Sequence, residues 1–305
     1  MRNVVGYAVT IVAAVCWGAS GVSADYLMEN HGVELMLLSF LRMFTSGTLL
    51  VAYALVRSRG VTPQHRLLVG SARNWRSIVI YAIFGLAACQ LSYMGVIRAS
   101  NAGTGTVLEY LGLILIVVWV CASHRRWPRA SEMSAIILAL SGTFLLSTHG
   151  SLDTLVLSPT TLAWGALAAL TLATYTLLPT HLIAAYGAEL VVGYGLLIAG
   201  AGVGLLGGVW RYSITWTPNV MLAMSITVVL GTAVAFTAYL WGVDRIGPVR
   251  ASLVGCIEPI AAICFSALIM GSAYTGADIV GMALIVGAVV TISVVDLLRA
   301  RRVSQ

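Results

Sequence analysis

Three ionisable residues, Arg42, Glu109 and Glu258, stand inside long apolar stretches of this sequence. An ionised group at the centre of a membrane helix costs about 2.5–3.5 kcal/mol, so each is expected to face a bundle interior or a water-filled cavity. A carboxylate there could contact an amine or carry a proton, and a guanidinium could contact a carboxylate. One alternative stays open: these groups pair with one another, or cap backbone carbonyls, and only hold the bundle together.

Polar and aromatic residues in the same apolar stretches extend this set. Thr106, Glu109, Tyr110 and Leu113 share one helical face because they are three and four residues apart. Plain packing is the alternative role for the mid-helix aromatic residues. We expect a substrate cavity to be lined by Trp17, Gln90, Tyr93, Glu109, Tyr110, Tyr175, Tyr239, Glu258 and Arg42. Glu258 would be the second-half counterpart of Glu109, and Arg42 a charge partner or a contact for a substrate carboxylate.

The elements that must position these residues are membrane helices. Hydrophobic residues make up 59% of the 305 residues, charged residues 9%, and the mean hydropathy is +0.95, whereas a soluble domain has about 25% charged residues. Apolar runs long enough to cross about 30 Å of hydrocarbon recur along the chain. We predict an all-α integral membrane protein with ten spans at 4–28, 33–56, 77–97, 101–122, 131–148, 161–182, 188–210, 219–241, 249–270 and 276–297.

Composition also excludes several kinds of chemistry. All 17 basic residues are arginine, so the chain has neither the lysine of a phosphate-binding loop nor the amine of a Schiff-base enzyme. Zinc-protease and nucleophile-elbow motifs are absent from the sequence. The five cysteines lie in apolar runs without a CxxC pair, and the five histidines lack metal-ligand spacing. We therefore expect no enzyme activity, no cofactor and no metal, and neither do we expect a nucleic-acid partner.

Arginine placement predicts the orientation. With the N-terminus in the cytoplasm, fourteen arginines fall inside and only Arg98 and Arg211 outside, which agrees with the positive-inside rule. Both termini are then cytoplasmic. The first span loosely resembles a secretory signal peptide, because Val22-Ser23-Ala24 precedes Asp25. We expect it to be retained, since its removal would destroy the internal symmetry described next.

The chain contains an internal duplication. His31-Gly32-Val33-Glu34-Leu35 matches Tyr186-Gly187-Ala188-Glu189-Leu190 at an offset of 155, and Glu109 matches Glu258 at an offset of 149. The predicted repeats are residues 1–148 and 149–305. Since each would hold five spans, an odd number, the second must insert upside down relative to the first. Inverted repeats of this kind are typical of secondary transporters, whose substrate site lies near the midplane between the repeats.

Several local motifs occur in an order typical of one family. They are Cys16-Trp17-Gly18-Ala19-Ser20, Phe40-Leu41-Arg42, Ser100-Asn101-Ala102-Gly103-Thr104, Gly247-Pro248-Val249-Arg250-Ala251-Ser252 and Glu258-Pro259. With the ten-span, two-repeat organisation, they make the chain resemble the EamA-domain exporters of the drug/metabolite transporter superfamily. The resemblance implies a central cavity walled mainly by the first, third, fourth, sixth, eighth and ninth spans, and export of amino acids or other amphipathic metabolites. Two departures are the carboxylate at Glu109 and the absence of a proline at Leu113.

We therefore expect a multi-pass transporter in the cytoplasmic (inner) membrane. It would export a small amphipathic metabolite such as an amino acid or related amine by alternating access. Protons are a candidate coupling ion, with Glu109 as the coupling group, and the assembly is a monomer or a homodimer. The alternatives are a passive channel or facilitator for small polar solutes and a multidrug or amphipathic-cation efflux protein.

Overall fold

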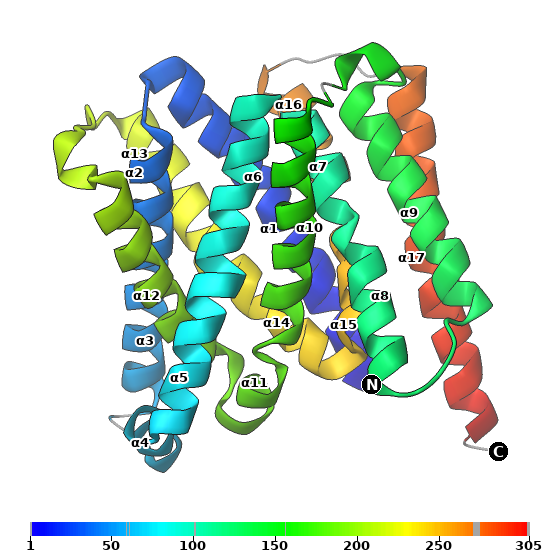
Figure 1. Cartoon of the computed structure of the whole chain (residues 1–305), viewed down its shortest axis with the longest axis horizontal. Helices are drawn as coiled ribbons and strands as arrows, with labels where there is room; N and C mark the ends of the chain where they lie inside the picture. The colour runs from blue at the N-terminus through cyan, green and yellow to red at the C-terminus, as the bar shows by residue number, and fades with distance from the viewer. Residues whose placement is uncertain are drawn as a thin grey trace.

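The computed structural model describes residues 2–58, 60, 62–100, 102–155, 157–270 and 275–303, and within these ranges it contains helices and no strand (Figure 1). The elements of the first part of the chain are α1 (Arg2–His31), α2 (Leu35–Phe40), η1 (Leu41–Thr45), α3 (Ser46–Arg57), α4 (Pro63–Gly70), α5 (Ala72–Ile80), η2 (Tyr81–Ala87), α6 (Ala88–Ala99), α7 (Ala102–Tyr110), α8 (Gly112–Ser123) and α9 (Ala130–Thr148).

The second part is built in a similar order. Its elements are η3 (Leu152–Thr154), α10 (Pro159–Leu177), α11 (Thr180–Tyr186), α12 (Ala188–Gly207), η4 (Val209–Arg211), α13 (Pro218–Ser225), η5 (Ile226–Val234), α14 (Ala235–Ile246), α15 (Pro248–Gly255), α16 (Glu258–Met270) and α17 (Gly276–Val303). The segments η1, η2 and η5 have π-helical geometry and continue directly into the neighbouring α-helices, so that several elements together form one membrane-length rod.

Nine stretches within the described residues are long and apolar enough to cross a membrane, and each coincides with a predicted span. The tenth predicted span coincides with a shorter apolar stretch, Gly276–Ile292, at the start of α17. The prediction of an all-helical membrane protein is therefore confirmed, while the count of ten spans stays a prediction. Successive rods run in opposite directions, which brings the N- and C-terminal ends of the chain to the same end of the bundle (Figure 1).

Two of the rods are interrupted in the middle. Between α7 and α8, the Leu111 nitrogen bonds to the Leu108 carbonyl, and between α15 and α16, the Cys256 nitrogen bonds to the Leu253 carbonyl. Both bonds span three residues, one fewer than in an α-helix, so each rod tightens into a turn before it resumes. Pro259 follows the second interruption, but no proline accompanies the first. Such irregular backbone is tolerated at membrane depth where it is buried in protein or lines a cavity.

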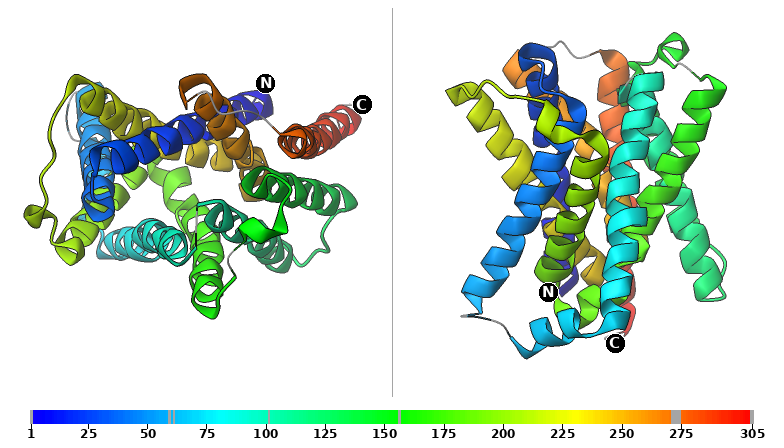
Figure 2. Two further views of the ribbon diagram at one scale, coloured as in Figure 1. Left: turned by 90° about the horizontal axis from the view of Figure 1, so that it is seen from above. Right: turned by 60° about the vertical axis from the view of Figure 1, so that its left-hand side comes forward.

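The two parts of the chain are interlocked. Helix α1 packs against η5 and against α13, α14, α15 and α16 of the second part, whereas α10 packs against η2, α6, α7 and α8 of the first part. Helices α9 and α17 pack extensively on each other and lie together at one side of the bundle (Figure 2). The inner bundle is therefore formed by elements of both parts and could not be completed by either part alone.

Glycine permits two features of this arrangement. Gly32 and Gly187 connect the first rod of each part to the next with φ of +60° and +86°, a backbone conformation that other residues rarely adopt. On α12, Gly200 and Gly204 face Phe44 and Phe40, and the missing side chains let α12 approach α2 and η1 closely. The four-residue spacing of these two glycines thus serves helix packing.

Candidate substrate-binding cavity

A cavity of about 580 Å³ lies between the rods. On α1 its lining residues run from Trp17 to Met28, and on α6 from Cys89 to Ile97, so it extends from the middle of the bundle toward the end at which α1 joins α2. Helices α2, α7, α10, α14, α15 and α16 contribute further lining residues, as do the end of α9 and the start of α17. Arg42 of η1 and Ser39 of α2 also line the cavity, so the second span forms part of the wall, which the family resemblance did not imply.

All nine residues predicted from the sequence line this cavity: Trp17, Arg42, Gln90, Tyr93, Glu109, Tyr110, Tyr175, Tyr239 and Glu258. They come from η1, α1, α6, α7, α10, α14 and α16 and were assigned without knowledge of how the helices pack. Their contact with a substrate remains a prediction.

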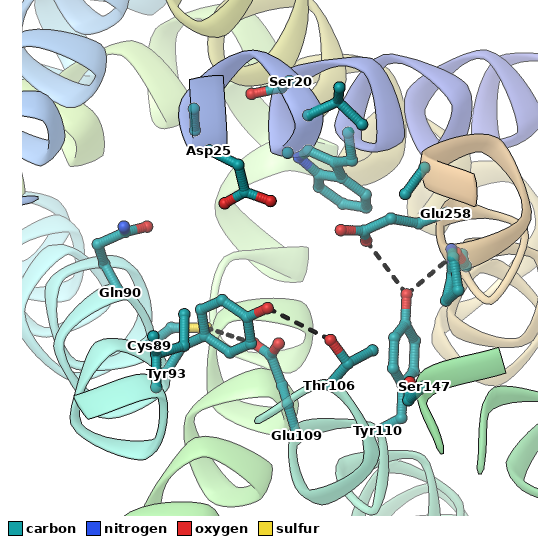
Figure 3. Close-up of a pocket in the computed structure, with 18 of the residues that line it drawn as sticks. Ser20, Asp25, Cys89, Gln90, Tyr93, Thr106, Glu109, Tyr110, Ser147 and Glu258 are labelled. Atoms are coloured by element: carbon teal, nitrogen blue, oxygen red, sulfur yellow. Dashed lines mark hydrogen bonds between the residues drawn. The ribbon is translucent and has the colours of Figure 1, made fainter. Parts of the chain in front are cut away.

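Glu109 lies on the wall formed by α6 and α7 (Figure 3). Its Oε1 accepts a weak hydrogen bond from the Cys89 thiol, with 3.3 Å between oxygen and sulfur. Beside it, the hydroxyls of Tyr93 and Thr106 lie 3.3 Å apart and link α6 to α7. A thiol is a poor donor, so most of the hydrogen-bonding capacity of the Glu109 carboxylate is left for a ligand or a proton.

Tyr110 connects the two interrupted rods. It is the last residue of α7, and its hydroxyl lies 3.1 Å from the Gly255 carbonyl, at the end of α15, and 3.1 Å from Glu258 Oε2, at the start of α16. The hydroxyl has one hydrogen and can donate fully to only one of these oxygens at a time. The two glutamates do not occupy equivalent places: Glu109 precedes the interruption of its rod, and Glu258 follows the interruption of the other.

Arg42 provides a positive charge on the wall formed by η1. Its Nε donates to the Thr232 hydroxyl of η5 over 3.1 Å. Among the described residues, no carboxylate oxygen lies within 4 Å of its guanidinium nitrogens. The guanidinium carries five N–H donors, and the single bond to Thr232 leaves most of them for another acceptor, such as a carboxylate. Nearby, Gln90 donates to Ser39 over 3.2 Å.

Four aromatic rings close the inner end of the cavity, and we call them the aromatic floor: Trp17, Tyr175, Phe236 and Tyr239. Trp17 contacts Phe236 and Tyr239 with ring centroids 5.4 and 5.1 Å apart, and Tyr175 contacts the same two rings at 5.8 Å. The Tyr239 hydroxyl bonds to Ser252 at 2.8 Å and to Thr176 at 3.2 Å. Tyr239 is 1% and Tyr175 5% exposed, whereas Trp17 and Phe236 are half-buried, so the two tyrosines are the tightly packed part of the floor.

The structure also brings residues to the cavity that the sequence did not single out. Asp25 of α1 points into it, close to the space that Glu109 and Glu258 face (Figure 3). At the mouth, His149 bonds to Asp278 at 2.8 Å, and the Asp278 carboxylate also accepts from the Thr275 nitrogen and hydroxyl. Within the described residues, no group of three potential metal ligands comes together.

The comparison with known proteins settles the family. The model of the EamA-like transporter family matches residues 4–148 and, a second time, residues 159–294. The chain belongs to this family. Its sequence is also 33% identical over 291 residues to an uncharacterized inner membrane transporter, YicL, of Salmonella typhimurium (strain LT2), covering 95% of this chain and 96% of that protein. The chain is therefore a multi-pass membrane transporter of the EamA family, as the motifs in the sequence indicated.

The fold is that of solved proteins. One crystal structure superposes on this chain with a TM-score of 0.79 at 19% sequence identity, covering 98% of this chain and 99% of the other. At this level of identity the likeness concerns the fold and says nothing about the substrate.

Proposed function

We propose that this EamA-family protein is a secondary transporter that exports small amphipathic metabolites, amino acids or related amines, across the inner membrane by alternating access. The observation that carries the proposal is the cavity, whose walls present a guanidinium at Arg42 and carboxylates at Glu109 and Glu258 in one space with aromatic surface. Groups of both signs suit a molecule with an amine and a carboxylate, and about 580 Å³ lies in the usual range for small-ligand pockets.

Sidedness determines which side of the membrane this cavity opens to. We place both termini in the cytoplasm, in a ten-span arrangement of two inverted repeats. Most described arginines lie at the end of the bundle that holds the N-terminus, whereas Arg98 and Arg211 lie at the opposite end. The cavity then opens to the outside, and the aromatic floor separates it from the cytoplasm. This is the outward-facing state of a carrier, and an inward-facing state must follow for substrate to be loaded.

The moving bodies need not coincide with the predicted repeats 1–148 and 149–305. Because α1 packs on α13–α16 and α10 packs on α6–α8, we propose that alternating access moves these two interlocked groups against each other. Tyr110 would act at their boundary, since it belongs to one group and bonds to Gly255 and Glu258 of the other.

The passive channel is the competing function, and the packed aromatic floor favours a carrier over it. Counterflow into proteoliposomes separates the two. Vesicles preloaded with unlabelled amino acid or amine should accelerate uptake of the labelled compound if the protein is a carrier. Unchanged uptake in preloaded vesicles, together with permeation above that of protein-free vesicles, would instead support a channel.

Proton coupling through Glu109 forms a separate part of the proposal. Substitution Glu109→Gln removes the ionisable group while preserving size, so transport should lose its dependence on a pH gradient. The matched control is Glu29→Gln, because Glu29 is exposed on α1 and does not line the cavity. If the Glu109→Gln protein responds to the gradient as the unmodified protein does, Glu109 does not couple protons.

A further inference from the structure

Asp25 is a cavity carboxylate to which no role has been assigned. It lies on α1 two helical turns after Trp17, and the lining residues Trp17, Gly21 and Asp25 recur every four residues along one face. At 1.5 Å per residue, Asp25 stands about 12 Å along the helix axis from Trp17, toward the cavity mouth. Figure 3 shows its carboxylate directed into the space that Glu109 and Glu258 also face.

Asp25 has no partner among the described residues. None of their hydrogen bonds or salt bridges involves its carboxylate. This distinguishes it from Asp278, which also lines the cavity but is occupied by His149 and Thr275. It differs as well from Glu109 and Glu258, which accept from Cys89 and Tyr110. Both oxygens of Asp25 are thus available to a ligand.

The charges of the cavity do not balance. Besides His149 and Asp278, which bond to each other, the cavity is lined by three acidic groups without a cationic partner within 4 Å, Asp25, Glu109 and Glu258, and by the cation Arg42. A zwitterion with one amine and one carboxylate would add no net charge and would leave this acidic excess. A ligand with two amines supplies a second positive charge, which the Asp25 carboxylate, exposed toward the cavity mouth, can pair.

We propose, on the basis of the transport function above, that the cavity selects substrates with two cationic amines, namely basic amino acids and diamines. Asp25 is the residue that determines this specificity. In a basic amino acid, the carboxylate contacts Arg42, the α-amine contacts the glutamates, and the side-chain amine contacts Asp25. The location of Asp25 toward the mouth places the second amine at the outer end of an elongated ligand.

Lysine and norleucine test this assignment because they differ in the terminal amine alone, and 1,5-diaminopentane lacks the carboxylate. Counterflow with the unmodified protein should reach half-saturation at a tenfold or lower concentration of lysine than of norleucine, and 1,5-diaminopentane should also be transported. In Asp25→Asn, the half-saturating lysine concentration should rise about tenfold while that for norleucine stays the same. Asp244→Asn, the same change at an exposed position of α14 outside the cavity, should change neither value.

The outcomes separate this inference from the proposed function. Equal preference for lysine and norleucine, or a lysine preference that Asp25→Asn leaves intact, overturns the assignment of Asp25 and leaves transport standing. Ligand-induced shifts in melting temperature provide the second measurement. If no compound supports counterflow but lysine stabilises the unmodified protein and not Asp25→Asn, the proposed transport fails and the binding assignment holds. If lysine neither moves through nor stabilises the protein, both fail.

Discussion

The same tyrosine pair occurs twice in this molecule, in different surroundings. Tyr93 of α6 bonds to Thr106 of α7, and Tyr239 of α14 bonds to Ser252 of α15. Tyr239 and Ser252 each stand 146 positions after Tyr93 and Thr106, which is also the offset between the helix interruptions, where the Leu111 and Ile257 nitrogens bond to the Leu108 and Val254 carbonyls. Both pairs line the cavity, but Tyr93 is half-buried, whereas Tyr239 belongs to the aromatic floor and is 1% exposed.

The difference between the pairs indicates how a duplicated chain can be open at one end and closed at the other. Both repeats place a tyrosine and a hydroxyl residue at related positions, but only Tyr239 is covered by Trp17 and Tyr175 and bonded to Thr176. In the proposed alternating-access cycle, the two pairs would exchange surroundings, with Tyr93 becoming covered when Tyr239 becomes exposed. Substitutions at equivalent positions of the two repeats test this comparison.

The largest difference is expected when each tyrosine is truncated. Tyr239→Ala leaves a hole among packed rings and should lower the free energy of unfolding by about 3 kcal/mol or more. Tyr93→Ala removes a ring that faces the cavity on one side, and its cost should be at least twofold smaller. Melting temperatures in detergent compare the stability of the two variants. Equal decreases would mean that Tyr93 and Tyr239 are packed equally well.

An intermediate difference is expected at the two helix interruptions. A Cβ on Gly112, at the start of α8, would lie 2.5 Å from the Ala169 carbonyl oxygen of α10, whereas a Cβ on Gly255, at the end of α15, would come no closer than 3.8 Å to Tyr239. Gly112→Ala should therefore cost about 1–3 kcal/mol through overpacking. Gly255→Ala, its matched control, should stay within about 0.5 kcal/mol of the unmodified protein. Comparable melting temperatures for the two variants would contradict the closer packing at the first interruption.

The smallest difference concerns the hydroxyl groups alone. Hydrogen bonds between membrane helices contribute about 0.6 kcal/mol on average and at most about 1.7 kcal/mol. Tyr239→Phe removes two buried contacts, to Ser252 and Thr176, and should cost about 1 kcal/mol. Tyr93→Phe should cost about 0.5 kcal/mol or less, because Thr106 borders the cavity. If Tyr93→Phe lowers the free energy of unfolding more than Tyr239→Phe does, the Tyr93–Thr106 bond contributes more to stability, contrary to this expectation.

Much of this architecture follows from the sequence because the bilayer imposes a fixed length and strict polarity. Hydropathy located the membrane spans, and polar side chains within them identified nine residues that all line the cavity. The motifs then indicated the correct family. A charged group in contact with lipid is so costly that a charged residue in the middle of a membrane helix is expected to face the interior of the bundle, whatever the fold.

The missed features lack such a signal. Asp25 lies close enough to the end of its helix that a carboxylate there is unremarkable in sequence. The contact between His149 and Asp278 joins residues 129 positions apart and depends on how α9 and α17 pack. No proline lies near Leu111, so the sequence does not indicate the helix interruption there. An offset of 149 aligns Glu109 with Glu258, but the helix ends place them on opposite sides of their interruptions.

The interlocked packing has a consequence for how the protein is made. Helix α1 leaves the ribosome well before α13 to α16, the helices that cover it, have been synthesised. During most of translation, the face of α1 that carries Trp17 and Asp25 must be shielded by lipid, by earlier helices in temporary positions or by the insertion machinery. The polar chamber can therefore be completed only after α13 to α16 have been synthesised.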